Sequence, residues 1–321
     1  MPDAIVIRGV TKTFGPKVAV SDLDLTIPHG SLYGFIGPNG AGKTTTIRMI
    51  MSILFPDRGE ISVLGKASAV ESKDRIGYLP EERGLYRKMR VLPFLTYMGR
   101  LKGVDPGGLH PKVRSWLDRV GLGDCARKKC EELSKGMQQK VQLIAALLHE
   151  PDLIILDEPF SGLDPENRRL LRELFEEQHK AGRTLIFSTH AMYEAEQLCD
   201  HLFMIAGGKK VLDMPMDALW RRFDPRTIVV EPLTRQDHLD GNLSQIPGVR
   251  RARRTDDGME LELADDADPG AVIAAASSAA RVRRVELKRV SVEEIFLSLV
   301  RGSGGEAGAD GVPAETGAAH A

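Results

Sequence analysis

The sequence predicts an α/β domain with a largely parallel sheet, followed by a small α+β domain. Strand-like apolar runs alternate with helical patterns over the first 220 residues, which is typical of a parallel sheet covered by helices. A glycine-rich turn joins one of these strands directly to a helix. From residue 224 the pattern changes to short strands around two helices, in the order β-α-β-β-α-β.

The elements of the first domain follow from its apolar runs. Strands are predicted at residues 4–8, 22–27, 33–36, 153–156, 184–188 and 202–205. Helices are predicted at residues 44–54 and 168–180. From about residue 85 to 150 the pattern is helical without a strand run, which predicts a helical subdomain inserted into the sheet. We therefore expect this domain to span residues 1–220.

The second domain is predicted at residues 224–300 as a ferredoxin-like arrangement. Its strands are expected at residues 227–231, 249–254, 259–263 and 281–288, and its helices at 236–245, 269–280 and 292–300. A turn at Asp256, Asp257 and Gly258 joins the second strand to the third. Residues 302–321 are rich in glycine, alanine and acidic residues without periodicity, so they are predicted to be a disordered tail.

Composition and charge limit the classes of function. The 44 basic and 45 acidic residues nearly cancel, so net charge does not draw the chain to nucleic acid or to anionic membranes. Three cysteines suit a reducing compartment better than a disulfide framework. No signal peptide is expected at the N-terminus, and no apolar run approaches the ~20 residues of a membrane span. The sequence predicts a cytoplasmic chain whose contact with a membrane is peripheral.

The glycine-rich turn has the composition and the position of a phosphate-binding loop. It reads GPNGAGKT, after a strand and at the start of a helix. Its glycines let backbone N–H groups surround the phosphates of ATP, Lys43 reaches the β- and γ-phosphates, and Thr44 binds Mg²⁺. The predicted nucleotide-binding residues here are Gly37, Pro38, Asn39, Gly40, Ala41, Gly42, Lys43, Thr44 and Thr45.

Two carboxylates, Asp157 and Glu158, follow the apolar strand at residues 153–156. The carboxyl ends of parallel strands form the edge at which α/β proteins bind ligands. Asp157 would hold the metal there, and Glu158 would polarise the attacking water. Taken alone, the pair is also compatible with acidic residues that cap the next helix. The phosphate-binding loop in the same chain favours the catalytic interpretation.

Together with two later motifs, these residues resemble the nucleotide-binding domain of ABC transporters. Residues 133–140, LSKGMQQK, resemble the family's signature, with Ser134 and Gly136 kept and Lys135 and Met137 departing from its commonest form. Ser134 would also cap the helix that follows it. The resemblance covers residues 4 to about 217, and it is closest to the ABC-2 or sodium-exporter-like type of ATP-binding subunit with a C-terminal accessory domain.

The resemblance implies a dimer. In the family two such domains pack head to tail, so that the signature of one chain contacts the γ-phosphate held by the other. The segment SGLD at residues 161–164 resembles the D-loop of the same interface. The residues expected to act on the partner's nucleotide are Ser134, Lys135, Gly136, Met137 and Asp164. A homodimer is therefore expected in the ATP state.

Three further residues take roles from the resemblance. His190 corresponds to the switch histidine that contacts the γ-phosphate, although a lone histidine after a strand is more often a structural one. Phe14 occupies the place of the aromatic residue that stacks on adenine, or it is a core phenylalanine. Glu81 stands where the family usually has a glutamine near the metal. It can accept a hydrogen bond from a metal-bound water, or it lowers turnover.

These motifs predict an ATP-hydrolysing transporter subunit, an exporter by its C-terminal extension, with membrane permease subunits docked on the helical stretch at residues 85–102. The alternative is a soluble ABC-type ATPase acting on nucleic acid or ribosomes. Gly37 and Leu133 stand only 96 positions apart, without an intervening coiled coil, and one phosphate-binding loop is present. Residues 224–300 hold 11 basic and 14 acidic residues, so no nucleic-acid partner is expected.

Overall fold

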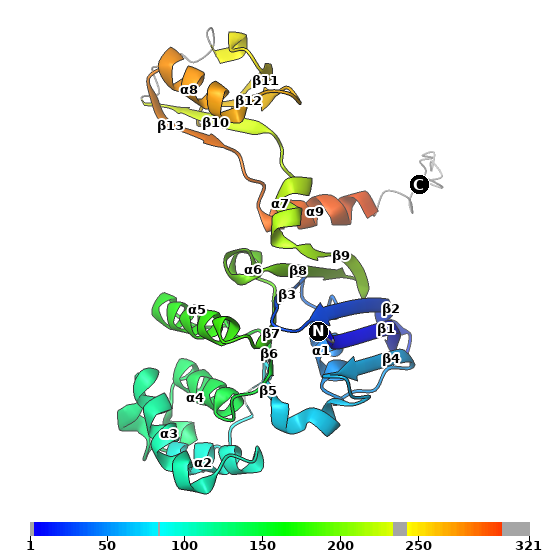
Figure 1. Cartoon of the computed structure of the whole chain (residues 1–321), viewed down its shortest axis with the longest axis vertical. Coiled ribbons are helices and arrows are strands. Elements are labelled where there is room, and N and C mark those ends of the chain that lie inside the picture. Colours follow the sequence, from blue (N-terminus) through cyan, green and yellow to red (C-terminus); the bar gives the residue numbers. More distant parts are fainter. Residues whose placement is uncertain (1–2, 83, 234–242, 304–321) are drawn as a thin grey trace, which may run out of the picture. The chain divides into compact units, whose positions relative to one another are not determined.

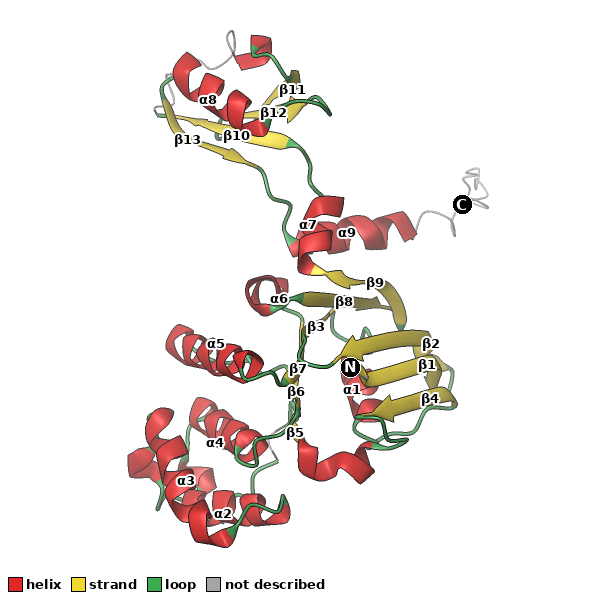
Figure 2. Cartoon of the chain, viewed as in Figure 1, coloured by secondary structure: helices red, strands yellow, loops and turns green. Residues whose placement is uncertain are grey.

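The structure is a computed structural model that describes residues 3–82, 84–233 and 243–303. These residues form two compact units, which Figures 1 and 2 show in the colours of the sequence and of the secondary structure. One unit comprises residues 3–216 and the end of the last helix from Phe296, and the other comprises residues 217–295.

The larger unit is built on a six-stranded sheet with the strand order β5-β6-β7-β3-β8-β9. Its strands are β3 (Leu32–Ile36), β5 (Ile76–Leu79), β6 (Leu153–Asp157), β7 (Thr184–Thr189), β8 (His201–Ala206) and β9 (Lys209–Pro215). All neighbours pair in parallel except β8 and β9. Both β6 and β7 are buried along their whole length, which explains their apolar runs at residues 153–156 and 185–187.

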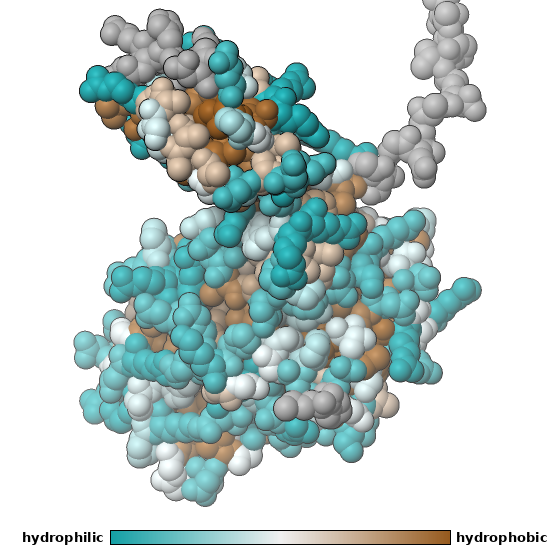
Figure 3. Space-filling view, turned by 45° about the horizontal axis from the view of Figure 1, so that its top comes forward, coloured by the Kyte–Doolittle hydropathy of each residue, from teal (hydrophilic) through white to brown (hydrophobic). Residues whose placement is uncertain are grey.

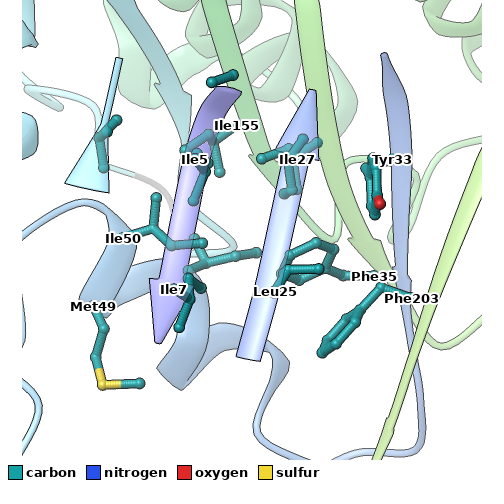
Figure 4. Close-up of a cluster of buried hydrophobic side chains, with 14 of the residues drawn as sticks. Ile5, Ile7, Leu25, Ile27, Tyr33, Phe35, Met49, Ile50, Ile155 and Phe203 are labelled. Atoms are coloured by element: carbon teal, nitrogen blue, oxygen red, sulfur yellow. The ribbon is translucent and has the colours of Figure 1, made fainter. Parts of the chain in front are cut away.

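A second, antiparallel sheet in this unit has the order β2-β1-β4. It consists of β1 (Asp3–Phe14), β2 (Lys17–Pro28) and β4 (Arg58–Val63). Figure 4 shows side chains of β1 and β2, such as Ile5 and Leu25, packed with Phe35 of β3 and Ile50 of α1 (Lys43–Ile50). This shared core fixes the position of α1, and with it the loop that precedes α1.

Helices cover the other side of the large sheet, where Figure 1 shows α4 and α5. The α-helices of this part are α2 (Val91–Leu101), α3 (Pro106–Arg119), α4 (Lys135–Leu147), α5 (Pro165–Lys180) and α6 (Met192–Leu198). Short 3-10 helices are η1 (Ala69–Arg75), η2 (Gly123–Cys125) and η3 (Cys130–Glu132). The helices from α2 to α4 fall in the stretch that the sequence predicts as the helical subdomain.

The smaller unit is a four-stranded antiparallel sheet with the order β11-β12-β10-β13. It contains β10 (Thr227–Pro232), β11 (Val249–Arg254), β12 (Met259–Leu263), β13 (Val282–Leu287), α8 (Pro269–Ala279) and η4 (Leu243–Gln245), and it begins with α7 (Met216–Arg222). The apolar core includes Ile228, Leu261 and Val272 of α8. An α/β domain followed by an antiparallel-sheet domain confirms that part of the predicted fold class.

Several basic residues of the smaller unit, on or next to its strands, pair with acidic neighbours. Arg250 pairs with Glu262, and Arg253 lies 2.7 Å from Glu260. Lys288 contacts the same Glu260 at 2.7 Å. Cross-strand pairs of this kind are the arrangement expected for a solvated sheet face.

The structure departs from the predicted elements in several places. The strands β4, β5 and β9 were not predicted, because they are short or carry several polar residues. Helix α1 ends four residues earlier than expected, and α9 (Val292–Ser303) ends three residues later. The helix predicted at residues 236–245 lies outside the described residues except for η4, and so does the predicted tail from residue 304.

Candidate nucleotide-binding site

The loop before α1 needs glycine at defined positions. Gly42 immediately precedes α1 with a φ of 114°, and a Cβ atom there would lie 2.6 Å from the carbonyl oxygen of Ala19. A Cβ on Gly37 would collide with the carbonyl of Ile205 on β8. The loop is therefore pressed against neighbouring backbone. It ends at the N-terminal end of α1, where an anion is favoured.

Lys43, the first residue of α1, is buried, with 5% of its surface exposed. Its Nζ donates to the carbonyl of Gly37 at 2.8 Å and to that of Pro38 at 3.2 Å. It also lies 3.6 Å from Oε1 of Glu158. A buried ammonium is stable only with such partners, and here they hold it across the loop. The loop therefore carries a fixed positive charge on its inner side.

Three side chains from three elements meet at Asp157. Thr44 of α1 donates to Oδ1 of Asp157 at 3.1 Å, and Ser188 of β7 donates to the same oxygen at 2.5 Å. The other oxygen, Oδ2, is buried and has no hydrogen-bond partner within the described residues. A buried carboxylate oxygen without a partner is costly. A hydroxyl beside a carboxylate supplies the hard oxygen ligands that Mg²⁺ prefers, so these residues fit that ion.

Glu158 and His190 lie next to this group. Nδ1 of His190 lies 2.9 Å from Oε2 of Glu158, and the carboxylate must be the acceptor. The backbone N–H of Glu158 donates to Oγ of Ser188 at 3.0 Å. Glu158 is 8% exposed and has a φ of 50°, a conformation that non-glycine residues seldom adopt. Strained backbone of this kind gathers at functional sites.

A cavity of about 320 Å³ opens beside Lys43, Thr44 and Glu158, whereas Asp157 and His190 are not among the residues that line it. It is lined by Phe14, Lys17, Ala19, Asn39, Gly40, Ala41, Gly42, Lys43, Thr44, Thr45, Glu81 and Glu158. The alternative prediction, that Phe14 is a core phenylalanine, is wrong, because Phe14 is 48% exposed and lines the cavity. Nζ of Lys12 lies 5.6 Å from the centre of that ring.

Glu81 reaches the cavity from the segment after β5. Its neighbour Tyr78 is half-buried, and burial raises the pKa of this phenol to about 12. The charge of Asp157 adds to the rise in pKa, whereas Arg48 on α1 opposes it, first through its charge and then through a hydrogen bond. Tyr78 on β5 therefore remains neutral and forms a hydrogen bond with Arg48 of α1.

The signature and D-loop residues begin two helices. Ser134 caps α4 and accepts from the N–H of Met137 at 3.3 Å. Asp164 caps α5 and accepts from the N–H of Asn167 at 2.8 Å. A Cβ atom added to Gly136 would meet the side chains of Leu163 and Asn167 at van der Waals distance, so Gly136 at the start of α4 lies close to the D-loop. Within the described chain these residues are not among those that line the cavity.

Sequence reasoning missed Ser188, Lys17 and Ala19. Ser188 hydrogen-bonds both the carboxylate of Asp157 and the backbone N–H of Glu158. Its position near the end of a buried strand, beside Thr189 and His190, is the feature of the sequence that could have indicated this role. Lys17 and Ala19 on β2 line the cavity, but nothing in their residue type indicates that they lie near the loop. That proximity depends on the antiparallel sheet, whose packing the sequence pattern did not predict.

Comparison with known proteins agrees with this geometry. The ABC transporter family model matches residues 20–161, and a model of the C-terminal domain of ATP-binding proteins like DrrA1-3 matches residues 215–300. A model described as AAA domain, putative AbiEii toxin, overlaps the first at residues 130–196. The uncharacterized ABC transporter ATP-binding protein YhaQ of Bacillus subtilis (strain 168) is 40% identical over 92% of this chain and 98% of its own.

Other relatives carry more informative names. The Nod factor export ATP-binding protein I of Burkholderia lata is 39% identical over 68% of this chain and 73% of its own length. Its namesake in Rhizobium sp. (strain N33) is 33% identical over 92% and 96%. A solved structure, that of an ATP binding subunit of an ABC transporter, superposes with a TM-score of 0.64 at 30% identity and covers 68% of this chain and 93% of that one.

The fold and the loop geometry define a P-loop ATPase of the α/β class. The chain belongs to the ABC transporter ATP-binding proteins, and it carries a DrrA-like C-terminal domain. Its ATP-binding domain therefore couples ATP hydrolysis to transport.

Within the described residues, no helix combines the length and the apolar character that crossing a bilayer requires. The face of the larger unit seen in Figure 3 is mostly hydrophilic, with small hydrophobic groups between.

Proposed function

We propose that this chain is the motor subunit of an exporter and that it works as a homodimer at the cytoplasmic face of the membrane. The observation that carries the proposal is the arrangement of Lys43, Asp157, Glu158 and His190 at the end of two neighbouring parallel strands, beside the phosphate-binding loop. The relatives named for Nod factor export support the direction of transport.

We propose that Thr44 and Asp157 hold Mg²⁺ and that Glu81 faces its bound water. The orphaned Oδ2 of Asp157 supports this role, because it is an acceptor already removed from water. When bound, Mg²⁺ neutralises charge on the β- and γ-phosphates. The hydrogen bond from the Ser188 hydroxyl to Oδ1 orients the Asp157 carboxylate. Glu81 lines the same cavity as Thr44, and its carboxylate can accept a hydrogen bond as the oxygen of the usual glutamine would.

In the proposed mechanism Lys43 exchanges its carbonyl partners for the phosphate oxygens. Its present partners at 2.8 and 3.2 Å are neutral, and a phosphate is a stronger acceptor for an ammonium. Glu158 then orients and polarises the attacking water, while the hydrogen bond from His190 fixes the carboxylate's orientation. We also assign the imidazole a contact with the γ-phosphate. Lys43 thus contributes to ATP binding, whereas Glu158 and His190 act in the transition state rather than in ground-state binding.

The homodimer completes the site in this proposal. Helix α4 begins at Ser134, Lys135, Gly136 and Met137, and the start of a helix carries a partial positive charge. Such a terminus suits the γ-phosphate of a nucleotide held by the partner. Asp164 at the start of α5 belongs to the same surface, since Gly136 lies near Asn167 of α5.

The membrane partners are proposed to be permease subunits that dock on α2 and the segment before it. Three aromatic rings lie close together there: the ring centre of Tyr86 is 6.1 Å from that of Phe94 and 6.0 Å from that of Tyr97. Tyr86, Tyr97 and Leu101 are all more than 40% exposed. Exposed aromatic side chains beside a hydrophobic residue are typical of interface anchors.

For the domain organisation we propose a nucleotide-binding domain at residues 1–220, with its helical subdomain at about 85–150, and an accessory domain at 224–300. A ferredoxin-like topology is supported by the antiparallel sheet order β11-β12-β10-β13, in which the two strands of the β11–β12 hairpin lie on the same side of β10. The tail from residue 302 is assigned no function.

A binding experiment tests the core of the proposal. Purified chain with Mg²⁺ should retain labelled ATP at millimolar concentration or below, and Lys43→Ala should weaken retention by at least tenfold, because it removes the loop's fixed positive charge. Lys210→Ala, an exposed lysine on β9 in the same unit, serves as the control. Equal retention by wild type and Lys43→Ala would refute the site. Co-purification with a membrane protein of several spans then tests the transport role.

A further inference from the structure

Asp57 stands at the end of a strand ladder and belongs to none of the nucleotide-binding motifs. Strand β4 begins at Arg58, which pairs with Thr11 of β1. The backbone N–H of Asp57 donates to the carbonyl of Thr11 at 2.8 Å. Beyond that point β1 continues to Phe14 and pairs with β2 through the contacts of Thr13 and Phe14. The last residues of β1 therefore extend past the start of β4.

Beyond the start of β4, the side chain of Asp57 supplies hydrogen-bond acceptors to the end of β1. Its Oδ2 accepts from both the backbone N–H and the hydroxyl of Thr13, each at 2.7 Å. Its Oδ1 accepts from Nζ of Lys12 at 2.8 Å. One carboxylate thus satisfies three donors on the two residues that directly precede Phe14. Charge-assisted bonds of this length are the stronger kind of hydrogen bond.

These contacts keep the carboxylate ionised. The hydrogen bonds from Lys12 and then from Thr13 lower the pKa of Asp57 to about 2. The negative charge is therefore present at every pH at which an ATPase is normally assayed.

A chain of contacts leads from Asp57 to the nucleotide cavity. Lys12, bound to Asp57, places its Nζ 5.6 Å from the ring centre of Phe14, within the range of a cation–π interaction. The Phe14 ring is 48% exposed and lines the cavity beside the phosphate-binding loop. Few other contacts can fix a ring with so much exposed surface, so its orientation depends on the backbone and the cation that Asp57 holds.

We propose that Asp57 is a positioning residue for adenine binding, which holds the Lys12–Phe14 end of β1 so that the ring of Phe14 is ready to stack on the base. The inference rests on the proposed function, in which Phe14 is the stacking residue. Without the carboxylate, the strand end and the ring would have to be ordered at the moment of binding, which costs affinity. The effect is confined to the base, because Asp57 contacts neither the phosphate-binding loop nor the acidic pair.

The experiment compares a ligand with a base and one without. Calorimetry with Mg²⁺ measures the Kd of a non-hydrolysable ATP analogue and that of inorganic tripolyphosphate. For Asp57→Ala we expect the ATP analogue to bind about fivefold to tenfold more weakly, a part of what base stacking contributes, and tripolyphosphate to bind as in wild type. KM for ATP should rise while kcat at saturating ATP stays within about twofold.

The chain offers a matched control in Asp24. Its carboxylate accepts from the backbone N–H of Gly9 at 2.8 Å, so it also ties side chain to backbone in the β1–β2 sheet, away from Phe14. Asp24→Ala should leave both Kd values unchanged. Tripolyphosphate binding by Asp57→Ala also reports that the variant's loop is folded. A loss of affinity for tripolyphosphate equal to that for the ATP analogue would overturn the proposal.

A double variant separates this inference from the role of Phe14 itself. Phe14→Ala should weaken binding of the ATP analogue by about tenfold, and adding Asp57→Ala should weaken it no further. If Phe14→Ala has no effect, the stacking role in the proposed function fails. If Phe14→Ala has the expected effect but Asp57→Ala has none, or if the Asp57→Ala loss persists in full in the double variant, only the positioning role fails.

Discussion

Nδ1 of His190 donates to Oε2 of Glu158 across 2.9 Å. Each of these residues directly follows a parallel strand, β6 or β7, and the strand ends are held in register by the pairing of Asp157 with Ser188. The hydrogen bond therefore depends on the sheet and not on a flexible loop. It makes the two side chains one unit, whose members should not act independently.

Glu158→Gln should abolish turnover while ATP binding is retained. The amide keeps the size of the side chain but cannot polarise water, so kcat should fall by about a hundredfold or more. The Kd for ATP should stay within about threefold of wild type, because ground-state contacts are kept. Phosphate release and nucleotide binding measure the two effects. Glu176→Gln, on the exposed side of α5, is the control; near-normal turnover in Glu158→Gln would remove Glu158 from its role.

The unit formed by His190 and Glu158 should show itself in a double-variant cycle. His190→Ala should lower kcat by about tenfold to a hundredfold, since the carboxylate loses its orienting donor. Combined with Glu158→Gln, it should lower kcat little further, because residues that act together are strongly non-additive. Single-turnover ATP hydrolysis gives the three values. Full additivity would mean that the hydrogen bond seen here has no part in the reaction.

Removal of the metal should reproduce the Asp157→Asn variant. Without Mg²⁺, wild type should bind ATP about as weakly as Asp157→Asn does with it, because both lack the ion's link between protein and phosphates. Ser188→Ala, which removes the donor behind Asp157, should raise the Mg²⁺ concentration for half-maximal activity by about tenfold. Titration of activity with Mg²⁺ measures this. Asp152 is exposed and directly precedes β6, at the opposite end of that strand from Asp157. Asp152→Asn should leave the titration unchanged.

The dimer can be tested at Ser134 without loss of the helix cap. Aspartate is as good an N-cap as serine, so Ser134→Asp should preserve α4. It adds a negative charge where the partner's γ-phosphate is expected. We therefore expect kcat to fall by at least tenfold with unchanged ATP binding to the monomer. Sedimentation of the Glu158→Gln variant with ATP and Mg²⁺ should show a dimer, which Ser134→Asp should prevent; a dimer that survives the change would argue against this interface.

Much of the nucleotide-binding loop could be predicted because its residues are local. Gly42, Lys43 and Thr44 follow one another in sequence, and their spacing alone requires a strand before and a helix after. The acidic pair was equally accessible, since it ends a buried strand. Ser188, Lys17 and Ala19 were not, because they reach the site through sheet packing over long sequence distances. Likewise, β4 carries too many polar residues and β5 is too short to be recognised without their partners.

Outside the nucleotide site, His149 should make stability depend on pH. Its Nε2 donates to the carbonyl of Ile76 at 3.1 Å, while Nδ1 is buried without a hydrogen-bond partner in the described chain. Burial, and secondly the charge of Lys102, lower the pKa of His149 to about 4. Lys102 itself donates to the same carbonyl at 2.9 Å. The folded protein thus keeps this imidazole neutral in a range where the unfolded chain protonates it.

The sign of the effect follows from proton binding. Between the unfolded pKa near 6.5 and the folded pKa near 4, the unfolded chain binds more protons, so stability is lost as pH falls through this window. After allowance for partial exposure, we expect a loss of about 1–2 kcal/mol. Urea unfolding at pH 7 and pH 4.5 measures it against His149→Gln, which can donate to Ile76 but does not titrate. Carboxylates contribute equally to both proteins, so an identical loss in the variant would show that His149 is not the group responsible.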